Sequence, residues 1–145
     1  MRKRAGIILI QEGKLALMER HRQGRHYFAF PGGGVDEGET DEQAAIREAM
    51  EELGIEVGIV QKAATILREG RRDQVYFLVK WLGGEYGTGT GEEFDEVDEE
   101  NGTYNPVWMP LGELLEKNVV PRGLAELVVK AQRDGWGESV VIRED

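Results

Sequence analysis

Short apolar runs separated by polar turns dominate the chain, and they predict a series of β-strands. Ala5–Ile10 and Lys14–Met18 flank the turn-forming pair Glu12-Gly13, so together they predict a hairpin. Three later apolar segments predict further strands: Ile55–Leu67, Gln74–Leu82 and Tyr104–Met109. The polar or glycine-rich segments between the strands are predicted to be loops: Arg20–His26, Arg68–Asp73 and Gly83–Gly102.

Helical periodicity is clearest between Thr40 and Leu53. Thr40 can cap the first turn, and Gln43 three residues later completes a capping box. Two acidic residues follow the cap directly, where the helix dipole favours negative charge. Gly54 is placed to end the helix in a left-handed conformation. The segment therefore contains start and stop signals as well as the helical period.

Two further helices are predicted at Leu111–Lys117 and Leu124–Arg133, and the tail Ser139–Ile142 is predicted either to add a strand or to fray. Strands on both sides of a central helix, with helices near the end, indicate a mixed α/β sandwich. The chain contains no repeat and no linker, and its length suits one domain. Residues 1–145 are therefore expected to form a single domain.

The Thr40–Leu53 helix separates apolar from charged positions. At about 100° per residue, one side gathers the apolar side chains that can pack on a sheet: Ala45, Ala49, Leu53, Ile46 and Met50. The other side gathers Arg47, Glu48, Glu51 and Glu52. A solvated helix face with an i,i+4 ion pair is one interpretation. The alternative is a hard cation such as Mg²⁺, because neighbouring carboxylates of like charge otherwise repel.

Three consecutive glycines, Gly32–Gly34, precede this helix, and glycine-rich turns often bind phosphate. A Walker loop would need Gly-Lys-Ser/Thr, whereas Gly34 is followed by Val35 and Asp36. The spacing also lacks the ligand pattern of an EF-hand and the last glycine of a dinucleotide-binding fingerprint. A cation held by the acids and bridging to a phosphate explains why both features occur in one segment.

Gly33, Glu39 and the run Arg47–Ile55 resemble the Nudix box, whose pattern is G-x5-E-x7-R-E-U-x-E-E-x-G-U with U a bulky aliphatic residue. Every fixed position is met, and the small Ala49 occupies one U position. The resemblance implies an α/β/α sandwich with a mixed β-sheet. It also implies a hydrolase that cleaves the diphosphate bond of a nucleoside diphosphate linked to another moiety, with Mg²⁺ or Mn²⁺ as cofactor.

The same resemblance implies roles for individual residues. The metal ligands would be three carboxylates and one backbone carbonyl, those of Glu48, Glu51, Glu52 and Gly32. Arg47 would orient the carboxylates by ion pairing, and Glu39 would brace the glycine turn against the helix. Gly33 and Gly54 would be structural positions of the motif.

The general base is left open between the box and an acidic loop. Glu48 or Glu51 could take the proton of the attacking water. An acid from the segment 92–100 could do the same, and seven of its nine residues are acidic. Glu93 is the first candidate there and Glu99 the second, although a solvated loop without a catalytic role is an equal alternative.

Substrate contacts are expected from the basic segment before the box: Arg20, His21, Arg22, Arg25 and His26. Arg25 is assigned to substrate phosphates and Tyr27 to base stacking, against a solvated turn and a structural aromatic as alternatives. Phe28 is expected to be a core or edge residue, with base stacking as the alternative. Tyr76, Trp81 and Tyr104 are expected to be structural, and Trp108 is expected to lie in the core. In the family that the box resembles, some subgroups linked with ADP-ribose carry a proline about fifteen residues after the box, and this chain has Gly70 there. The resemblance, the small size and the lack of an extra domain therefore favour nucleoside triphosphates, including damaged ones.

Several alternatives stay open for the function. ADP-ribose, nucleotide sugars and dinucleoside polyphosphates are other substrates that the resemblance allows. A nucleotide sensor without activity and a structural Mg²⁺ or Ca²⁺ domain are alternatives from other classes. A homodimer is common in the family and stays open here.

Composition narrows the partners. The net charge of -10 disfavours binding of a nucleic-acid polymer, because its phosphates would be repelled. The absence of cysteine excludes disulfides and thiolate metal sites. No apolar run reaches the roughly 20 residues of a membrane span, and Ala5–Ile10 is too short for a signal sequence. We therefore expect a soluble cytoplasmic protein with a small-molecule nucleotide substrate and no membrane partner.

Overall fold

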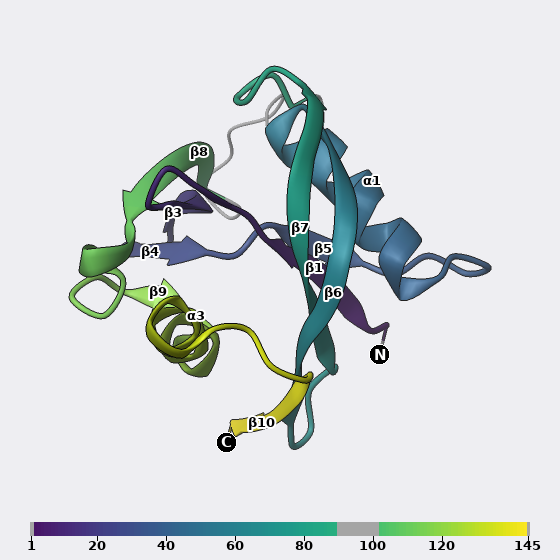
Figure 1. The fold of residues 1–145 in the computed structure, drawn as a ribbon. Coiled ribbons are helices and arrows are strands. Elements are labelled where there is room, and N and C mark those ends of the chain that lie inside the picture. The colour runs from purple at the N-terminus through teal and green to yellow at the C-terminus, as the bar shows by residue number, and fades with distance from the viewer. Residues whose placement is uncertain (1, 90–101, 145) are drawn as a thin grey trace.

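The structure, a computed structural model, describes residues 2–89 and 102–144 (Figure 1). Its strands are β1 (Arg4–Ile8), β2 (Ile10–Gln11), β3 (Lys14–Arg22), β4 (Arg25–Ala29), β5 (Gly32–Gly34), β6 (Ile55–Arg68), β7 (Gln74–Gly84), β8 (Thr103–Pro110), β9 (Val119–Val120) and β10 (Val140–Glu144). Its helices are α1 (Asp41–Leu53), the 3₁₀ turn η1 (Leu111–Glu113) and α3 (Arg122–Asp134).

The strands form two sheets. Sheet A has the order β10-β6-β7-β1-β5, and it is mixed because β1 pairs parallel with β7 and antiparallel with β5. Sheet B has the order β2-β3-β4-β9, and β8 pairs with the other edge of β3. The predicted α/β class with a mixed sheet is confirmed.

The two long helices pack on opposite faces of sheet A (Figure 1). Alternate residues of a strand point to opposite faces, so Ala5 and Ile7 of β1 join one core cluster while Ile8 joins the other. α1 belongs to the first cluster through its alanines and Leu53. α3 belongs to the second through Leu124, Ala125 and Val128. Sheet A is therefore buried on both sides.

Three predicted segments differ from the structure. The apolar run Ala5–Ile10 is divided between the sheets, since β1 joins sheet A while β2 forms the predicted hairpin with β3. The predicted loop Arg20–His26 is wrong, because β3 and β4 continue through it and leave only Gln23-Gly24 as a turn. Both turn residues have positive φ, 50° and 77°. The helix predicted at Leu111–Lys117 is limited to the 3₁₀ turn η1.

α1 is rotated relative to the predicted apolar face. Met50 was expected to pack on the sheet but is 45% exposed. Glu52, expected on the polar side, is only 5% exposed and lies among the buried alanines of the helix. The helix therefore directs part of its carboxylate face inward, toward the edge of sheet A that β5 forms.

Candidate active site

Both ends of α1 are held by local hydrogen bonds that the sequence specifies. The Thr40 side chain accepts from the Gln43 backbone N–H at 3.1 Å, and the Gln43 side chain accepts from the Thr40 N–H at 2.9 Å. Gly54 ends the helix with φ 77° and donates to the Met50 carbonyl at 3.0 Å. The predicted capping box and terminal glycine are both confirmed.

Arg47 connects the turn to the carboxylates of the helix. Its Nε and Nη2 donate to the two oxygens of Glu39 at 2.8 and 3.0 Å, and Nη2 also donates to the Gly34 carbonyl at 2.9 Å. Its Nη1 donates to Glu48 at 2.9 Å and to Glu51 at 3.1 Å. The guanidinium thus fixes carboxylates and backbone from three parts of the motif at once.

This network shifts the pKa values of its members. The Glu39 hydrogen bonds raise the pKa of Arg47, in spite of partial burial and with further support from Glu48. The Arg47 hydrogen bonds and the Asp36 backbone N–H lower the pKa of Glu39 to about 2. Both groups are therefore charged at neutral pH, as their role in orienting the box requires.

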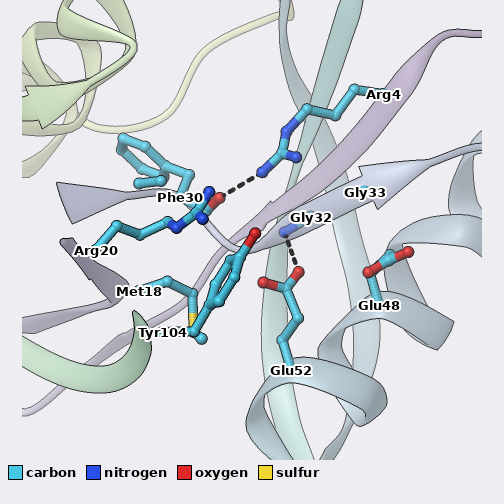
Figure 2. A pocket seen from close by; sticks show the side chains of 10 residues that line it. Arg4, Met18, Arg20, Phe30, Gly32, Gly33, Glu48, Glu52 and Tyr104 are labelled. Atoms are coloured by element: carbon cyan, nitrogen blue, oxygen red, sulfur yellow. Dashed lines mark hydrogen bonds between the residues drawn. The ribbon is translucent and has the colours of Figure 1, made fainter. Parts of the chain in front are cut away.

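Glu48 and Glu52 enter a pocket of about 230 Å³ beside the glycine turn (Figure 2). Glu52 accepts a hydrogen bond from the Gly32 N–H at 2.7 Å. Gly33 lies so close to the Glu48 carboxylate that a Cβ at this position would collide with it. The pocket is lined by Arg4, Met18, Arg20, Ala29, Phe30, Gly32, Gly33, Glu48, Glu52 and Tyr104.

The structure brings together some of the predicted site residues and separates others. Glu48 and Glu52 share the pocket with Gly32 and Gly33, whereas Glu51 is not among the lining residues and contacts Arg47 instead. Tyr27 lines an adjoining pocket. Arg25 is exposed, with its guanidinium carbon 5.2 Å from the Tyr27 ring centre. Glu93 and Glu99 lie outside the described residues.

The predicted basic segment is split by the hairpin that it forms. Arg20 points into the pocket (Figure 2). His21 and His26 are exposed, and their rings stack on each other with centroids 4.2 Å apart. Neither histidine lines this pocket. His26 also contacts Glu19 at 2.7 Å. Because β-strand residues alternate between faces, only part of a charged hairpin can face one pocket.

Some of the aromatic residues pack in the core, whereas Tyr104 lines the carboxylate pocket. Tyr76 is 1% exposed and belongs to the second core cluster, although it also lines the adjoining pocket. Trp81 and Trp108 both pack against the first core cluster. Trp108 was expected in the core but stays only partly buried, with its ring 4.3 Å from that of Tyr86. Tyr104 was expected to be structural, but it lines the pocket.

Sequence reasoning missed Arg4 as a pocket residue. Its Nη2 donates to the Phe30 carbonyl at 3.0 Å, and it lies across the pocket from Glu48 and Glu52 (Figure 2). Burial lowers the pKa of Arg4, but Tyr76 and Glu52 raise it by more, so the net shift is upward. The signal is the pairing of Arg4 with Gly34, which only the sheet register reveals.

The donor set suits a hard divalent cation. Three carboxylates lie on adjacent turns of one helix, and one of them, Glu52, is buried and accepts a hydrogen bond from the Gly32 backbone N–H. Oxygen ligands of this kind match Mg²⁺ and Mn²⁺ better than softer metals. The residues present therefore fit the metal that the box implies.

Comparison with known proteins agrees with this geometry. The NUDIX domain family matches residues 1–128. An RNA pyrophosphohydrolase of Tolumonas auensis is 42% identical over 81 residues, covering 56% of this chain and 44% of that protein. A putative mutator protein MutT4 of Mycobacterium tuberculosis is 33% identical over 127 residues, covering 79% of this chain and 47% of its own length. The chain thus spans about half the length of these relatives.

Solved structures resemble the fold over most of the chain. A NUDIX hydrolase from Nitrosomonas europaea has a TM-score of 0.75 at 19% identity. The match covers 99% of this chain and 79% of the chain of that hydrolase. A C. elegans Ap4A hydrolase covers 90% of this chain and 96% of its own, with a TM-score of 0.64 at 22% identity. The match to most of the sequence, together with the intact box, shows that the chain belongs to the Nudix family.

None of the helices in the described ranges 2–89 and 102–144 has the length together with the hydropathy that a membrane span requires.

Proposed function

We propose that this chain is a metal-dependent hydrolase that cleaves a phosphoanhydride in a nucleotide, with nucleoside triphosphates as the favoured substrates. The observation that carries the proposal is the pair Glu48 and Glu52, held side by side in a pocket next to the glycine turn. The relatives agree in chemistry, since names such as RNA pyrophosphohydrolase, ADP-ribose pyrophosphatase and Ap4A hydrolase all describe cleavage of phosphate anhydrides.

Glu48, Glu51 and Glu52 would hold Mg²⁺ or Mn²⁺, with the Gly32 carbonyl as a further ligand. When bound, the metal supplies positive charge that makes the phosphorus accessible to water. Arg47 keeps Glu48 and Glu51 oriented toward one another through its Nη1. The missing Cβ of Gly33 leaves room for the Glu48 carboxylate beside the backbone.

The arginines of the pocket bind the substrate rather than the metal. Arg4 and Arg20 line the same pocket as the carboxylates, so they can contact phosphate oxygens while the carboxylates face the cation. Glu48 and Glu51 are the candidates for general base within the described residues, and Glu93 remains a candidate from the acidic segment 92–100. Tyr27, which lines the adjoining pocket, and the exposed Arg25 beside it are proposed to contact the substrate as well.

The test is turnover of a substrate panel by the purified protein with Mg²⁺. The panel contains a nucleoside triphosphate, an oxidised guanine triphosphate, ADP-ribose, a nucleotide sugar, a dinucleoside polyphosphate and a 5′-triphosphorylated RNA oligonucleotide. The RNA is included because several relatives are named RNA pyrophosphohydrolase. We expect turnover of at least one member and none without a divalent cation.

Glu52→Gln is the informative variant, because glutamine keeps an oxygen that can accept from the Gly32 N–H while removing the charge. We expect turnover to fall by ~100-fold or more, which is typical when a metal ligand is lost. Glu56→Gln is the matched control, since Glu56 is an exposed glutamate on β6. Binding of the panel without turnover of any member would instead support the nucleotide sensor.

A further inference from the structure

A second pocket, of about 200 Å³, adjoins the carboxylate pocket. The two pockets share Arg4, Arg20, Ala29 and Phe30, so these residues form the boundary between them. The second pocket is lined by Arg4, Arg20, Tyr27, Ala29, Phe30, Arg68, Arg72, Gln74, Tyr76, Val120 and Pro121. Four of these are arginines and none is acidic, and we call this the arginine pocket.

The arginines come from distant parts of the chain. Arg4 begins β1 and lies beside Gln74 in the parallel register of β1 and β7. Arg68 ends β6, and Arg72 lies in the turn that leads from β6 to β7. Arg20 comes from sheet B, where its guanidinium carbon lies 3.6 Å from the Tyr104 ring centre. The fold thus concentrates positive charge at one end of sheet A.

This concentration is unfavourable without an anion. Burial lowers the pKa of Arg72, and the neighbouring charges of Arg4, Arg2 and Arg68 lower it further. Arg68 and Arg72 form no salt bridge with any carboxylate in the described parts of the chain. The Nε of Arg68 is buried and has no hydrogen-bond partner there either.

An exposed arrangement would relieve this repulsion at little cost, because side chains at a surface can separate in water. Here the guanidinium groups are partly buried around a cavity. Arginine is also the side chain best suited to phosphate, since its planar donors match two phosphate oxygens. A protein of net charge -10 that nevertheless gathers four arginines around one cavity is arranged to receive negative charge there.

We propose that the arginine pocket binds a third phosphate of the substrate, beyond the two that are joined by the cleaved anhydride. The inference rests on the proposed function, because it takes the carboxylate pocket as the place of cleavage. It also defines the substrate class. Nucleoside triphosphates, dinucleoside polyphosphates and 5′-triphosphorylated RNA carry a third phosphate, whereas ADP-ribose and nucleotide sugars carry only two.

Binding tests the pocket independently of catalysis. The probe is inorganic tripolyphosphate, titrated by calorimetry into the metal-free protein in the presence of a chelator. The variant is Arg68→Gln/Arg72→Gln, and the matched control is Arg71→Gln, which removes an exposed arginine of the same turn. We expect affinity to fall ~10-fold or more in the double variant and less than ~2-fold in the control.

The double variant is expected to fold, because it removes mutual repulsion. Its melting temperature should equal or exceed that of the wild type. Equal affinities in the wild type and the double variant would overturn the proposal, as would an equal loss in Arg71→Gln. Since no turnover is needed, this result stands even if the proposed hydrolase activity is absent.

Kinetics then test the substrate class. With Mg²⁺, the double variant should raise KM for a nucleoside triphosphate by ~10-fold or more and leave kcat nearly unchanged, since the pocket lies beside the carboxylates rather than among them. Its kinetics with ADP-ribose should be unchanged. An equal rise in KM for both substrates would overturn the proposal.

The third phosphate that reaches the pocket can be either the end of a polyphosphate chain or a phosphodiester group, and one comparison of substrates distinguishes the two. A nucleoside triphosphate carries it at the end of the polyphosphate, whereas a 5′-diphosphorylated dinucleotide carries it in the phosphodiester. The double variant should impair only the substrate whose third phosphate reaches the pocket. Impairment of either supports the proposal and names the source, and impairment of neither overturns it.

Discussion

The guanidinium of Arg47 and the carboxylate of Glu39 meet in a two-point contact, with Nε–Oε2 at 2.8 Å and Nη2–Oε1 at 3.0 Å. Glu39 lies before the helix and Arg47 lies within it, so the contact fixes the angle at which the turn enters α1. The remaining donors of Arg47 reach Gly34, Glu48 and Glu51. One planar side chain therefore positions the carboxylates relative to the glycine backbone.

Arg47→Lys should destabilise the protein by about 1–3 kcal/mol, because a lysine keeps the charge but cannot form the two-point contact. Urea unfolding would measure the loss. Arg133→Lys is the control, since Arg133 forms a similar contact with Asp134 at 3.1 and 3.2 Å on an exposed surface. We expect a much smaller loss there, because an ion pair exposed to water contributes little to stability. Equal losses of stability in the two variants would show that the Arg47 contacts contribute no more than an exposed ion pair.

The low pKa of Glu39 predicts a contribution to acid stability. Its folded-state pKa of about 2 lies below the ordinary value of 4.5, so the ionised carboxylate stabilises the folded protein. This contribution is complete above pH 4.5 and is lost as the pH falls toward 2. The free energy of unfolding of Glu39→Gln should therefore approach that of the wild type at acid pH. A constant difference across this range would contradict the prediction, and Glu56→Gln is the exposed control.

Gly33→Ala should impair activity more than stability. The new Cβ would collide with the Glu48 carboxylate, which can move aside but then leaves its place in the pocket. Displacement of a catalytic group by about 1 Å can cost 10²-fold in rate, so we expect a loss of about that size. Gly112→Ala is the control, because nothing lies within 4 Å of a Cβ there. Turnover and melting temperature are measured together, and a large fall in melting temperature would argue for misfolding instead.

Gly54→Ala should destabilise α1 for two reasons. The left-handed conformation, with φ 77°, costs an alanine about 1–2 kcal/mol, and the new Cβ would also collide with Thr88. Gly13→Ala separates the two effects, because Gly13 has φ 76° but open space around it. Thermal unfolding should show a larger loss for Gly54→Ala, and equal losses would mean that Thr88 simply moves away.

Local sequence predicted the helix of the site well. The Thr40 cap, the Gln43 partner and the terminal Gly54 are interactions within a few residues, so they can be inferred without knowing the fold. The rotation of the helix could not be inferred in this way. Glu52 is buried because the backbone N–H of Gly32 faces it, and Gly32 lies in β5, a strand at the edge of sheet A.

Two turns of the same kind show why one hairpin was predicted and the other missed. Glu12-Gly13 and Gln23-Gly24 both have two residues with positive φ, near 50° and 76°. The first turn is flanked by apolar strands and was recognised. The second turn is flanked by charged residues, so the strands on either side of it lack the apolar pattern by which a strand is predicted. Alternation along a strand is visible in a sequence only when one face is apolar.

The arginine pocket could not be predicted from local patterns. Arg68 and Arg72 look like surface charges of one polar turn in the sequence, and only the parallel pairing of β1 with β7 brings Arg4 beside them. Sequence reasoning placed the basic contacts in Arg20–His26 because those residues are adjacent along the chain. Arg20 of that segment lines both pockets, and Tyr27, which follows the segment, lines the arginine pocket. His21 and His26 line neither of them.

The position of β1 has a consequence for the order in which the protein folds. Among the described strands, β5 pairs in sheet A with β1 alone, and the other partner of β1, β7, begins at Gln74. Contacts between residues so far apart along the chain form slowly, because a long loop must close first. We therefore expect the pocket to be completed only after the β6–β7 hairpin has formed. Substitutions that delay that hairpin would postpone the appearance of activity during refolding, even where they lie far from any carboxylate.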